Sequence, residues 1–230
     1  MLTANNSQLI QVRDVYKVYQ RGQEKVEALH AIHLDVERGA FVVIMGPSGC
    51  GKSTLLHLLG GIDHPTRGSL SVEGVALEKA NERELTHFRR DHVGFIFQFY
   101  NLLPSINALD NASLPLLAKG FSRTEALRQA RYLLELVGLP DRMYHKPGEL
   151  SGGEQQRVAI ARAIAGSPSL VLADEPTGDL DSSTTEAVIQ LMVDLNHRLG
   201  TTFVVATHNE RISQFGDRLL ELRSGVLMES

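Results

Sequence analysis

Residues 46–54 read Gly46-Pro47-Ser48-Gly49-Cys50-Gly51-Lys52-Ser53-Thr54, and they follow directly on the apolar run Phe-Val-Val-Ile-Met at residues 41–45. A buried strand, a glycine-rich turn, and a lysine and a hydroxyl at the start of a helix are the arrangement of a phosphate-binding loop. The glycines allow backbone angles that other residues avoid, so that main-chain amides can turn toward an anion. This stretch therefore predicts an α/β fold that binds a nucleoside triphosphate.

The chemistry of the loop assigns its last residues to phosphate and metal. Lys52 is expected to neutralise the outer phosphates, and Ser53 to offer its hydroxyl to Mg²⁺. The helix expected over residues 52–59 adds the positive end of its dipole. The alternative, a glycine-rich turn that matches by accident, is disfavoured because the full pattern and both flanks agree.

Composition limits the possible partners and compartments. The 230 residues are 43% hydrophobic, enough for one sizeable core, and the net charge of −4 gives no sign of a nucleic-acid partner. The single cysteine, Cys50, is typical of a reducing compartment. No run approaches the ~18–20 apolar residues of a membrane span. Residues 1–6 have neither a basic segment nor an apolar core, so we expect no secretory signal.

Hydrophobic periodicity predicts strands toward both ends of the chain, with a helical region between them. Strands are expected at residues 9–19, 28–36, 70–75, 93–97, 170–173 and 203–206. Residues from about 100 to 165 have a helical pattern, which includes an S-x-x-E capping box at Ser122 and Glu125. We therefore expect a nucleotide-binding core formed by residues 1–98 and 166–230, interrupted by a helical insertion at 99–165.

Two carboxylates follow the apolar run at 170–173. Asp174 and Glu175 come at the carboxyl end of a parallel strand, where open α/β sheets bind ligands. Asp174 is expected to hold Mg²⁺ opposite Ser53, and Glu175 to polarise an attacking water. The alternative is an acidic strand end exposed to solvent.

The segment Leu-Ser-Gly-Gly-Glu-Gln-Gln at 150–156 allows two interpretations. Ser151 and Glu154 form a capping box at the start of a helix. Gly152 and Gly153 are poor helix formers, however, and their bare amides would attract an anion. Because the chain already has one phosphate loop, we infer that this helix start faces a nucleotide held by a second copy. Purely structural use is the alternative.

These segments together resemble the ATP-binding cassette family, from about residue 9 to the C-terminus. In that resemblance residues 46–54 correspond to Walker A, 150–156 to the signature, 170–175 to Walker B and 178–181 to the D-loop. Gln98 corresponds to the Q-loop glutamine and His208 to the switch histidine. Tyr19, or alternatively Tyr16, falls where the family stacks an aromatic ring on adenine. The chain departs from the usual pattern at Asp179 and Asn209, without losing a catalytic position.

The resemblance implies a P-loop NTPase core of the RecA type with an N-terminal antiparallel β subdomain and a helical insertion. It implies ATP and Mg²⁺ as cofactors and a head-to-tail homodimer, in which each ATP lies between the loop of one copy and the signature of the other. The catalytic residues would be Lys52, Gln98, Glu175 and His208. The metal ligands would be Ser53, Gln98 and Asp174. Tyr19, residues 46–54, Ser151, Gly152, Gly153 and Asp181 would contact the nucleotide.

Four further segments, within residues 58–66, 94–98, 101–104 and 173–181, are similar to bacterial lipoprotein-releasing and macrolide-exporting ATPases. This likeness implies an ATP-hydrolysing subunit at the cytoplasmic face of the cell membrane. Its partner would be a permease. The apolar and aromatic residues at 98–104, among them Tyr100 and Leu103, are expected to form the hinge into the helical region and the surface where a cytoplasmic coupling helix docks; the alternative is an interdomain core segment. The cargo would be lipoprotein, peptide or drug. The alternatives are a regulatory, cell-division type of ATPase and a non-transport cassette protein.

Overall fold

The computed structural model describes residues 7–22 and 24–229, so the expectation about a secretory signal at residues 1–6 lies outside it. The strands are β1 (Gln8–Arg21), β2 (Glu24–Glu37), β3 (Phe41–Met45), β4 (Arg67–Val72), β5 (Val75–Ala76), β6 (Val93–Phe97), β7 (Leu170–Asp174), β8 (Thr202–Thr207), β9 (Arg218–Arg223) and β10 (Val226–Glu229). The α-helices are α1 (Lys52–Leu59), α2 (Glu82–His92), α3 (Ala108–Ala118), α4 (Arg123–Leu136), α5 (Gly152–Ile164) and α6 (Ser182–Leu199). Within these described residues no helix is both long and apolar enough to cross a bilayer.

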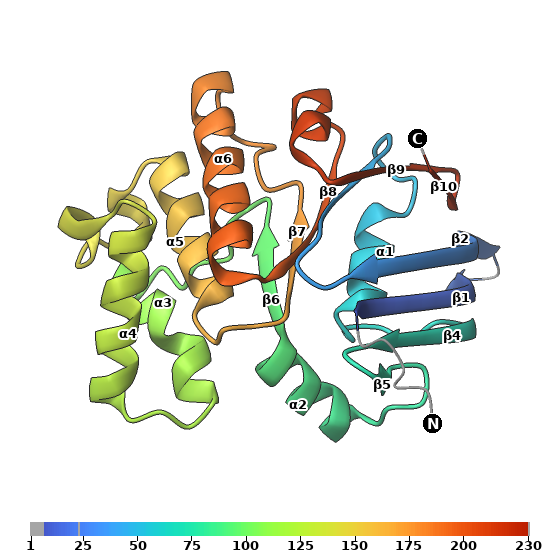
Figure 1. Ribbon diagram of the computed structural model, residues 1–230, viewed down its shortest axis with the longest axis horizontal. Coiled ribbons are helices and arrows are strands. Elements are labelled where there is room, and N and C mark those ends of the chain that lie inside the picture. The colour runs from blue at the N-terminus through green and yellow to red at the C-terminus, as the bar shows by residue number, and fades with distance from the viewer. Residues whose placement is uncertain (1–6, 23, 230) are drawn as a thin grey trace.

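Two sheets form the framework. The first has the order β2-β1-β4-β5 and is antiparallel. The second has the order β10-β9-β3-β8-β7-β6; it is parallel from β9 to β6, and β10 joins its edge antiparallel. Figure 1 shows α1 between the two sheets, with α3, α4, α5 and α6 on the far side of the second. The predicted fold class, an α/β core with an antiparallel N-terminal sheet and a helical insertion, is confirmed.

The central strand β3 explains why its sequence is apolar throughout. Successive residues of a strand face opposite sides of the sheet. Phe41 and Val43 pack in the core shared with α3–α6, whereas Val42 and Ile44 pack in the core shared with α1 and the antiparallel sheet. Because both faces of the sheet are covered, the strand needs a continuous apolar run. β3 is thereby fixed rigidly, with the phosphate loop at its carboxyl end.

The helix α2 was not expected from the sequence. Its residues, ERELTHFRRDH, are almost all polar, so they gave no clear apolar stripe. The signal lies at its start, where the side chain of Asn81 accepts the main-chain N–H groups of Arg83 and Glu84. The carboxylate of Glu84 in turn accepts the N–H of Asn81, which completes a capping box.

The second helix between β6 and β7, α4, begins where the sequence predicts a capping box at Ser122. Ser122 caps α4 by accepting the N–H of Glu125. The Glu125 carboxylate bonds Arg128 and Gln129, so the expected reciprocal bond back to Ser122 is replaced by contacts one turn further along α4.

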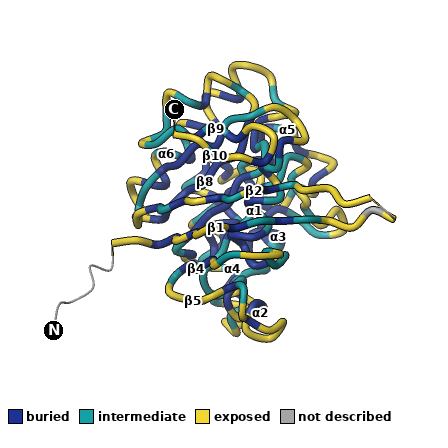
Figure 2. The backbone as a smooth tube through the Cα atoms, turned by 90° about the vertical axis from the view of Figure 1, so that its right-hand side faces the viewer, coloured by how far each residue is buried: buried dark blue, intermediate teal, exposed yellow. Residues whose placement is uncertain are grey.

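Figure 2 shows that the β1–β2 hairpin, in contrast to this packed region, extends from the body with mainly exposed residues toward its tip.

Candidate nucleotide-binding site

The loop between β3 and α1 turns tightly. Its glycines are required for two different steric reasons. Gly49 and Gly51 have φ angles of 80° and 110°, in the left-handed region that side chains disfavour. Gly46 does not have such an angle, contrary to expectation. A Cβ on Gly46 would lie 2.3 Å from the carbonyl oxygen of Leu222 on β9. Glycine is therefore needed at position 46 because β9 passes so close.

A cavity of about 480 Å³ opens over this loop. It is lined by residues 48–54 of the loop, by residues 26–28 of β2, by Gln98 and Glu175, and by residues 224–225 beyond β9. Its volume lies in the range of small-molecule sites, roughly 300–1,000 Å³. Three of the features predicted from sequence, the phosphate loop, Gln98 and Glu175, thus surround one cavity.

The side chains of Lys52 and Glu175 meet in this cavity. Lys52 donates to the carbonyl oxygens of Gly46 at 2.8 Å and Pro47 at 3.1 Å, and its Nζ lies 3.3 Å from Oε1 of Glu175. The same Oε1 lies 3.0 Å from Nδ1 of His208, and Oε2 accepts the main-chain N–H of His208 at 3.2 Å. Glu175 therefore contacts both the loop lysine and the predicted switch histidine.

The residues proposed to hold Mg²⁺ can be tested against the packing around Asp174. Asp174 ends β7, where it pairs with Phe97 of β6 and Ala206 of β8. Among the atoms that the structure describes, its Oδ1 is buried without a hydrogen-bond partner. A buried carboxylate oxygen is costly unless it is paired or coordinates a metal. Together with the hydroxyl of Ser53 in the cavity wall, this oxygen fits the oxygen-ligand preference of Mg²⁺.

Gln98 makes a contact that the sequence did not predict. Its Nε2 donates to Oδ1 of Asp179 at 3.2 Å, which connects the end of β6 to the segment following Glu175. Since the amide nitrogen is used in this way, the amide oxygen is the atom that would serve a cation. Asp179, noted above only as a departure from the family pattern, thus has a structural role in holding Gln98.

Of the two tyrosines left open by the sequence, Tyr19 is the one beside the cavity. It pairs across the β1–β2 hairpin with Val26, a residue of the cavity wall. The ring of Tyr16 is occupied by other groups, because the Arg67 guanidinium lies 4.0 Å from its centroid and the ring of His30 lies 4.9 Å away. Tyr19 therefore lies beside the cavity, and its role in stacking the base stays a prediction.

The predicted capping box at the start of α5 is confirmed. Ser151 accepts the N–H of Glu154 at 3.3 Å, and the Glu154 carboxylate accepts the N–H of Ser151 at 2.8 Å. This bond from the Ser151 main chain is the main cause that lowers the pKa of Glu154. The lining of the cavity over the phosphate loop does not include residues 151–153. Within one chain, the predicted signature residues and the phosphate loop therefore do not line the same cavity.

The two glycines at the start of α5 also have a packing reason that the sequence did not disclose. A Cβ on Gly152 would lie 2.9 Å from the hydroxyl oxygen of Tyr100, and a Cβ on Gly153 would lie 2.5 Å from Cγ2 of Thr184. Neither position accepts a side chain without a shift of its neighbours. Hence the glycines alone are not evidence of an anion site. An experiment is needed to separate their role in packing from a role in binding phosphate.

Asp181, predicted to contact nucleotide, is the N-cap of α6. Its carboxylate accepts the main-chain N–H groups of Ser183 and Thr184 and both of their hydroxyls. These bonds, of which that from the Ser183 side chain is the largest influence, hold the pKa of Asp181 far below its usual range. Its role toward nucleotide stays a prediction, since the cap alone accounts for the acid at this position.

A partly buried arginine was missed from the sequence. Arg162 of α5 donates to the carbonyl oxygens of Tyr100, at 2.8 Å, and Asn101. Tyr100 and Asn101 have left-handed φ angles of 59° and 49°, so this guanidinium fixes a strained turn just after Gln98. Burial lowers the pKa of Arg162. The available signal was a charged residue within the apolar run of α5.

The surface expected to dock a permease needs one correction. Phe99 and Leu103 are 73% and 47% exposed, as a docking surface requires. Tyr100 is only partly exposed, and its hydroxyl packs against Gly152. Because Tyr100 supports the start of α5, a charge at this position would disturb the signature segment directly. Phe99 replaces Tyr100 as the residue to test for docking.

Comparison with known proteins finds relatives along almost the whole chain. Residues 29–178 match the ABC transporter family. The chain is 44% identical over 223 residues to the lipoprotein-releasing system ATP-binding protein LolD of Alcanivorax borkumensis. This alignment covers 97% of this chain and 98% of LolD. It is 48% identical over 221 residues to the macrolide export ATP-binding/permease protein MacB of Bdellovibrio bacteriovorus, covering 95% of this chain and 33% of MacB. A solved dimeric structure of the ATP-binding cassette MJ0796 in a post-hydrolysis state, bound to ADP and Pi, is similar with a TM-score of 0.88 and 42% identity, covering 96% of this chain and 98% of that one.

Proposed function

The chain belongs to the ABC transporter family, and from this membership we propose that it is the ATP-hydrolysing subunit of a bacterial transporter whose permease is a separate chain. The observation that carries the proposal is the pair of contacts made by Glu175, to Lys52 and to His208, at the wall of the phosphate-loop cavity. A carboxylate between a lysine and a histidine over a phosphate loop is suited to phosphoryl transfer to water.

ATP is proposed to join two copies head to tail. Its phosphates would lie on the loop of one copy, and Ser151 and the amides of Gly152 and Gly153 would complete the γ-phosphate shell from the other. The absence of residues 151–153 from the lining of the cavity within one chain supports this arrangement. The dimeric form of MJ0796 supports it further. ATP then favours the closed dimer because it makes contacts there that the open form lacks.

The chemistry follows from the residues around the cavity. Lys52 would move from the carbonyls of Gly46 and Pro47 to the phosphate oxygens, which carry more negative charge. Glu175 would then accept hydrogen bonds from the attacking water, and His208 would contact the γ-phosphate. Mg²⁺, held by Ser53, Asp174 and Gln98, would neutralise phosphate charge when bound.

The permease is proposed to place a cytoplasmic coupling helix against Phe99 and Leu103. This contact would hold the chain at the cytoplasmic face of the membrane. The exposure of these two side chains, within five residues of Gln98 in sequence, supports the surface. Similarity to LolD and MacB supports export or extraction of lipoprotein, peptide or drug as the task. The domain boundaries at 98/99 and 165/166 remain part of this proposal.

The test is hydrolysis of Mg·ATP by the purified chain, alone and with its permease in lipid nanodiscs. We expect permease-stimulated phosphate release that EDTA abolishes. Phe99→Asp with Leu103→Asp should keep the basal rate and lose the stimulation, whereas Tyr132→Asp, at an exposed aromatic on α4, should keep both. Hydrolysis absent in every condition would overturn the proposal. Stimulation by the permease that no candidate cargo increases would favour the regulatory alternative.

A further inference from the structure

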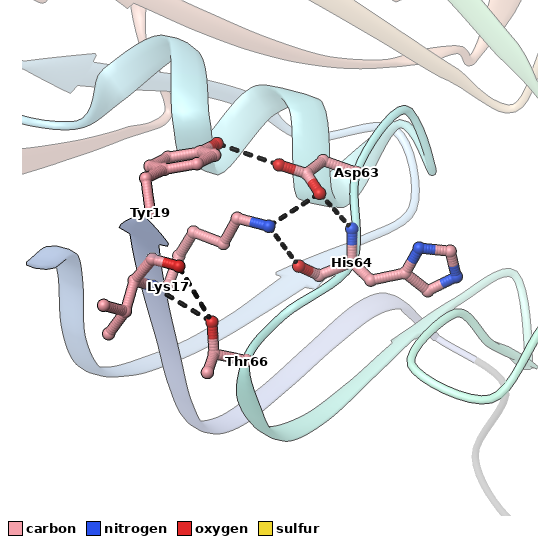
Figure 3. Close-up of polar contacts among 6 residues, drawn as sticks. Lys17, Tyr19, Asp63, His64 and Thr66 are labelled. Carbon is pink, nitrogen blue, oxygen red and sulfur yellow. Dashed lines mark hydrogen bonds and ion pairs between the residues drawn. The ribbon is translucent and has the colours of Figure 1, made fainter. Parts of the chain in front are cut away.

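One polar network connects β1 to the turn that follows α1. Lys17 donates to Oδ1 of Asp63 at 2.6 Å and to the carbonyl oxygen of His64 at 2.8 Å. The hydroxyl of Tyr19 donates to Oδ2 of Asp63 at 2.9 Å (Figure 3). The main-chain N–H of His64 also donates to Asp63, at 2.7 Å. Both carboxylate oxygens of Asp63 thus accept hydrogen bonds from side chains of β1, Oδ1 from Lys17 and Oδ2 from Tyr19.

The network leaves the Tyr19 ring in a defined orientation. Nζ of Lys17 lies 4.7 Å from the centroid of the ring, over one of its faces. An ammonium over an aromatic face is attracted by the ring quadrupole. Lys17 covers one face, so a planar base would stack on the other; the residue is 38% exposed. Burial, followed by the bond to Asp63, raises the pKa of Tyr19, so its hydroxyl remains a donor at neutral pH.

The orientation is relevant to nucleotide because Tyr19 lies beside the cavity over the phosphate loop. Tyr19 pairs across the β1–β2 hairpin with Val26, which lines the cavity together with Thr54 of α1. Asp63 comes just after the end of the same helix. Asp63, which accepts the bond from the ring hydroxyl, and the residues expected to grip phosphate therefore belong to one continuous segment, from the loop through α1 to the turn.

We propose that Asp63 is a positioning residue for nucleotide binding, which holds the Tyr19 ring as the platform for the base of ATP while Lys17 covers its other face. This inference rests on the proposed role of Tyr19 in stacking the base. Asp63 itself does not line the cavity over the phosphate loop. Its removal should therefore weaken recognition of the base and leave recognition of the triphosphate unchanged.

The experiment compares two ligands, Mg·ATP and Mg·tripolyphosphate, which has the phosphates without the base. The variants are Asp63→Asn, Tyr19→Phe, their combination, and Tyr19→Ala. The matched control is Asp14→Asn, an exposed carboxylate on β1 that pairs with Arg67. Dissociation constants come from calorimetry, and KM and kcat from phosphate release. Circular dichroism and thermal melting confirm that each variant is folded.

We expect Asp63→Asn to raise the dissociation constant and KM for ATP by roughly 3- to 10-fold, the effect of one hydrogen-bonded anchor, with kcat and tripolyphosphate binding unchanged. Tyr19→Phe should do the same, and the double variant should be no worse than either single one. Equal loss of ATP and tripolyphosphate binding, or no loss for Asp63→Asn when Tyr19→Ala does weaken ATP, would overturn the inference. Unchanged ATP binding in Tyr19→Ala would instead contradict the proposed role of Tyr19 itself.

Discussion

The ammonium of Lys52 lies 3.3 Å from a carboxylate oxygen of Glu175, and both side chains are largely buried, at 6% and 14% exposure. The phosphate loop and the carboxyl end of β7 are therefore joined by one ion pair. A triphosphate bound on the loop would compete with Glu175 for this lysine. Nucleotide binding would thus set Glu175 free to orient water at the time when it is needed.

Replacing Glu175 by glutamine tests this role. Glutamine keeps the size of the side chain but cannot accept a proton, so turnover should fall by roughly 10²-fold or more while ATP still binds. A closed, ATP-bound dimer should accumulate, as measured by light scattering after size-exclusion chromatography. The control is Glu186→Gln, an exposed carboxylate of α6. Hydrolysis at the wild-type rate would remove Glu175 from its proposed role.

A pair of variants separates packing from phosphate contact at Gly153. Gly153→Ala introduces a Cβ 2.5 Å from Cγ2 of Thr184, and Thr184→Ser removes that methyl group while keeping the hydroxyl that bonds Asp181. The double variant should therefore recover the thermal stability that Gly153→Ala loses. If Gly153 also faces γ-phosphate in the dimer, hydrolysis stays low in the double variant. Recovery of both stability and hydrolysis would leave packing as the sole reason for this glycine.

The sequence was sufficient for the framework because the relevant signals are local. The helix at 52–59 and the strand at 93–97 coincide with α1 and β6, since a glycine turn and a short apolar run fix them over a few residues. Contacts between distant segments were not predictable in this way. The partners Lys17 and Asp63 are 46 residues apart, and Arg162 and Asn101 are 61 apart, and no local pattern pairs them. The polar helix α2 was missed because it has little apolar face to detect.

The partly buried Arg162, whose guanidinium bonds two carbonyl oxygens, should contribute to stability. Arg162→Leu leaves two carbonyl oxygens without their charged donor, so the free energy of unfolding should fall by about 2–3 kcal/mol in urea denaturation. Amide exchange should also become faster at residues 98–104. Arg162→Lys should be intermediate, because an ammonium lacks the planar fork that spans two acceptors. Arg128→Leu, at an exposed position on α4, is the control, and a loss as large in that variant would refute a specific role for Arg162.

The network at Asp63 should make stability depend on pH. Although burial opposes ionisation, hydrogen bonds from Lys17, Tyr19 and the His64 main chain lower the pKa of Asp63. A carboxyl group whose pKa is lower in the folded state stabilises the fold above its unfolded pKa, and this stabilisation is lost as the pH falls through the folded pKa.

The wild-type chain should therefore be more stable than Asp63→Asn at neutral pH. The difference should shrink below about pH 4, the usual range of an aspartate. Urea unfolding at a series of pH values measures it, with Asp14→Asn as the comparison. A difference that is independent of pH would contradict the proposed charge-dependent contacts.

The central claim, that each catalytic site is shared between two copies, is tested most directly by mixing two inactive variants. Lys52→Ala disables the phosphate loop, and Ser151→Arg blocks the signature, so each alone should hydrolyse almost no ATP. In a mixed dimer the intact loop of one copy faces the intact signature of the other, and with random pairing the mixture should regain at most about a quarter of wild-type activity. A mixture that stays as inactive as its components, while wild-type activity per chain is unchanged on dilution, would contradict the account.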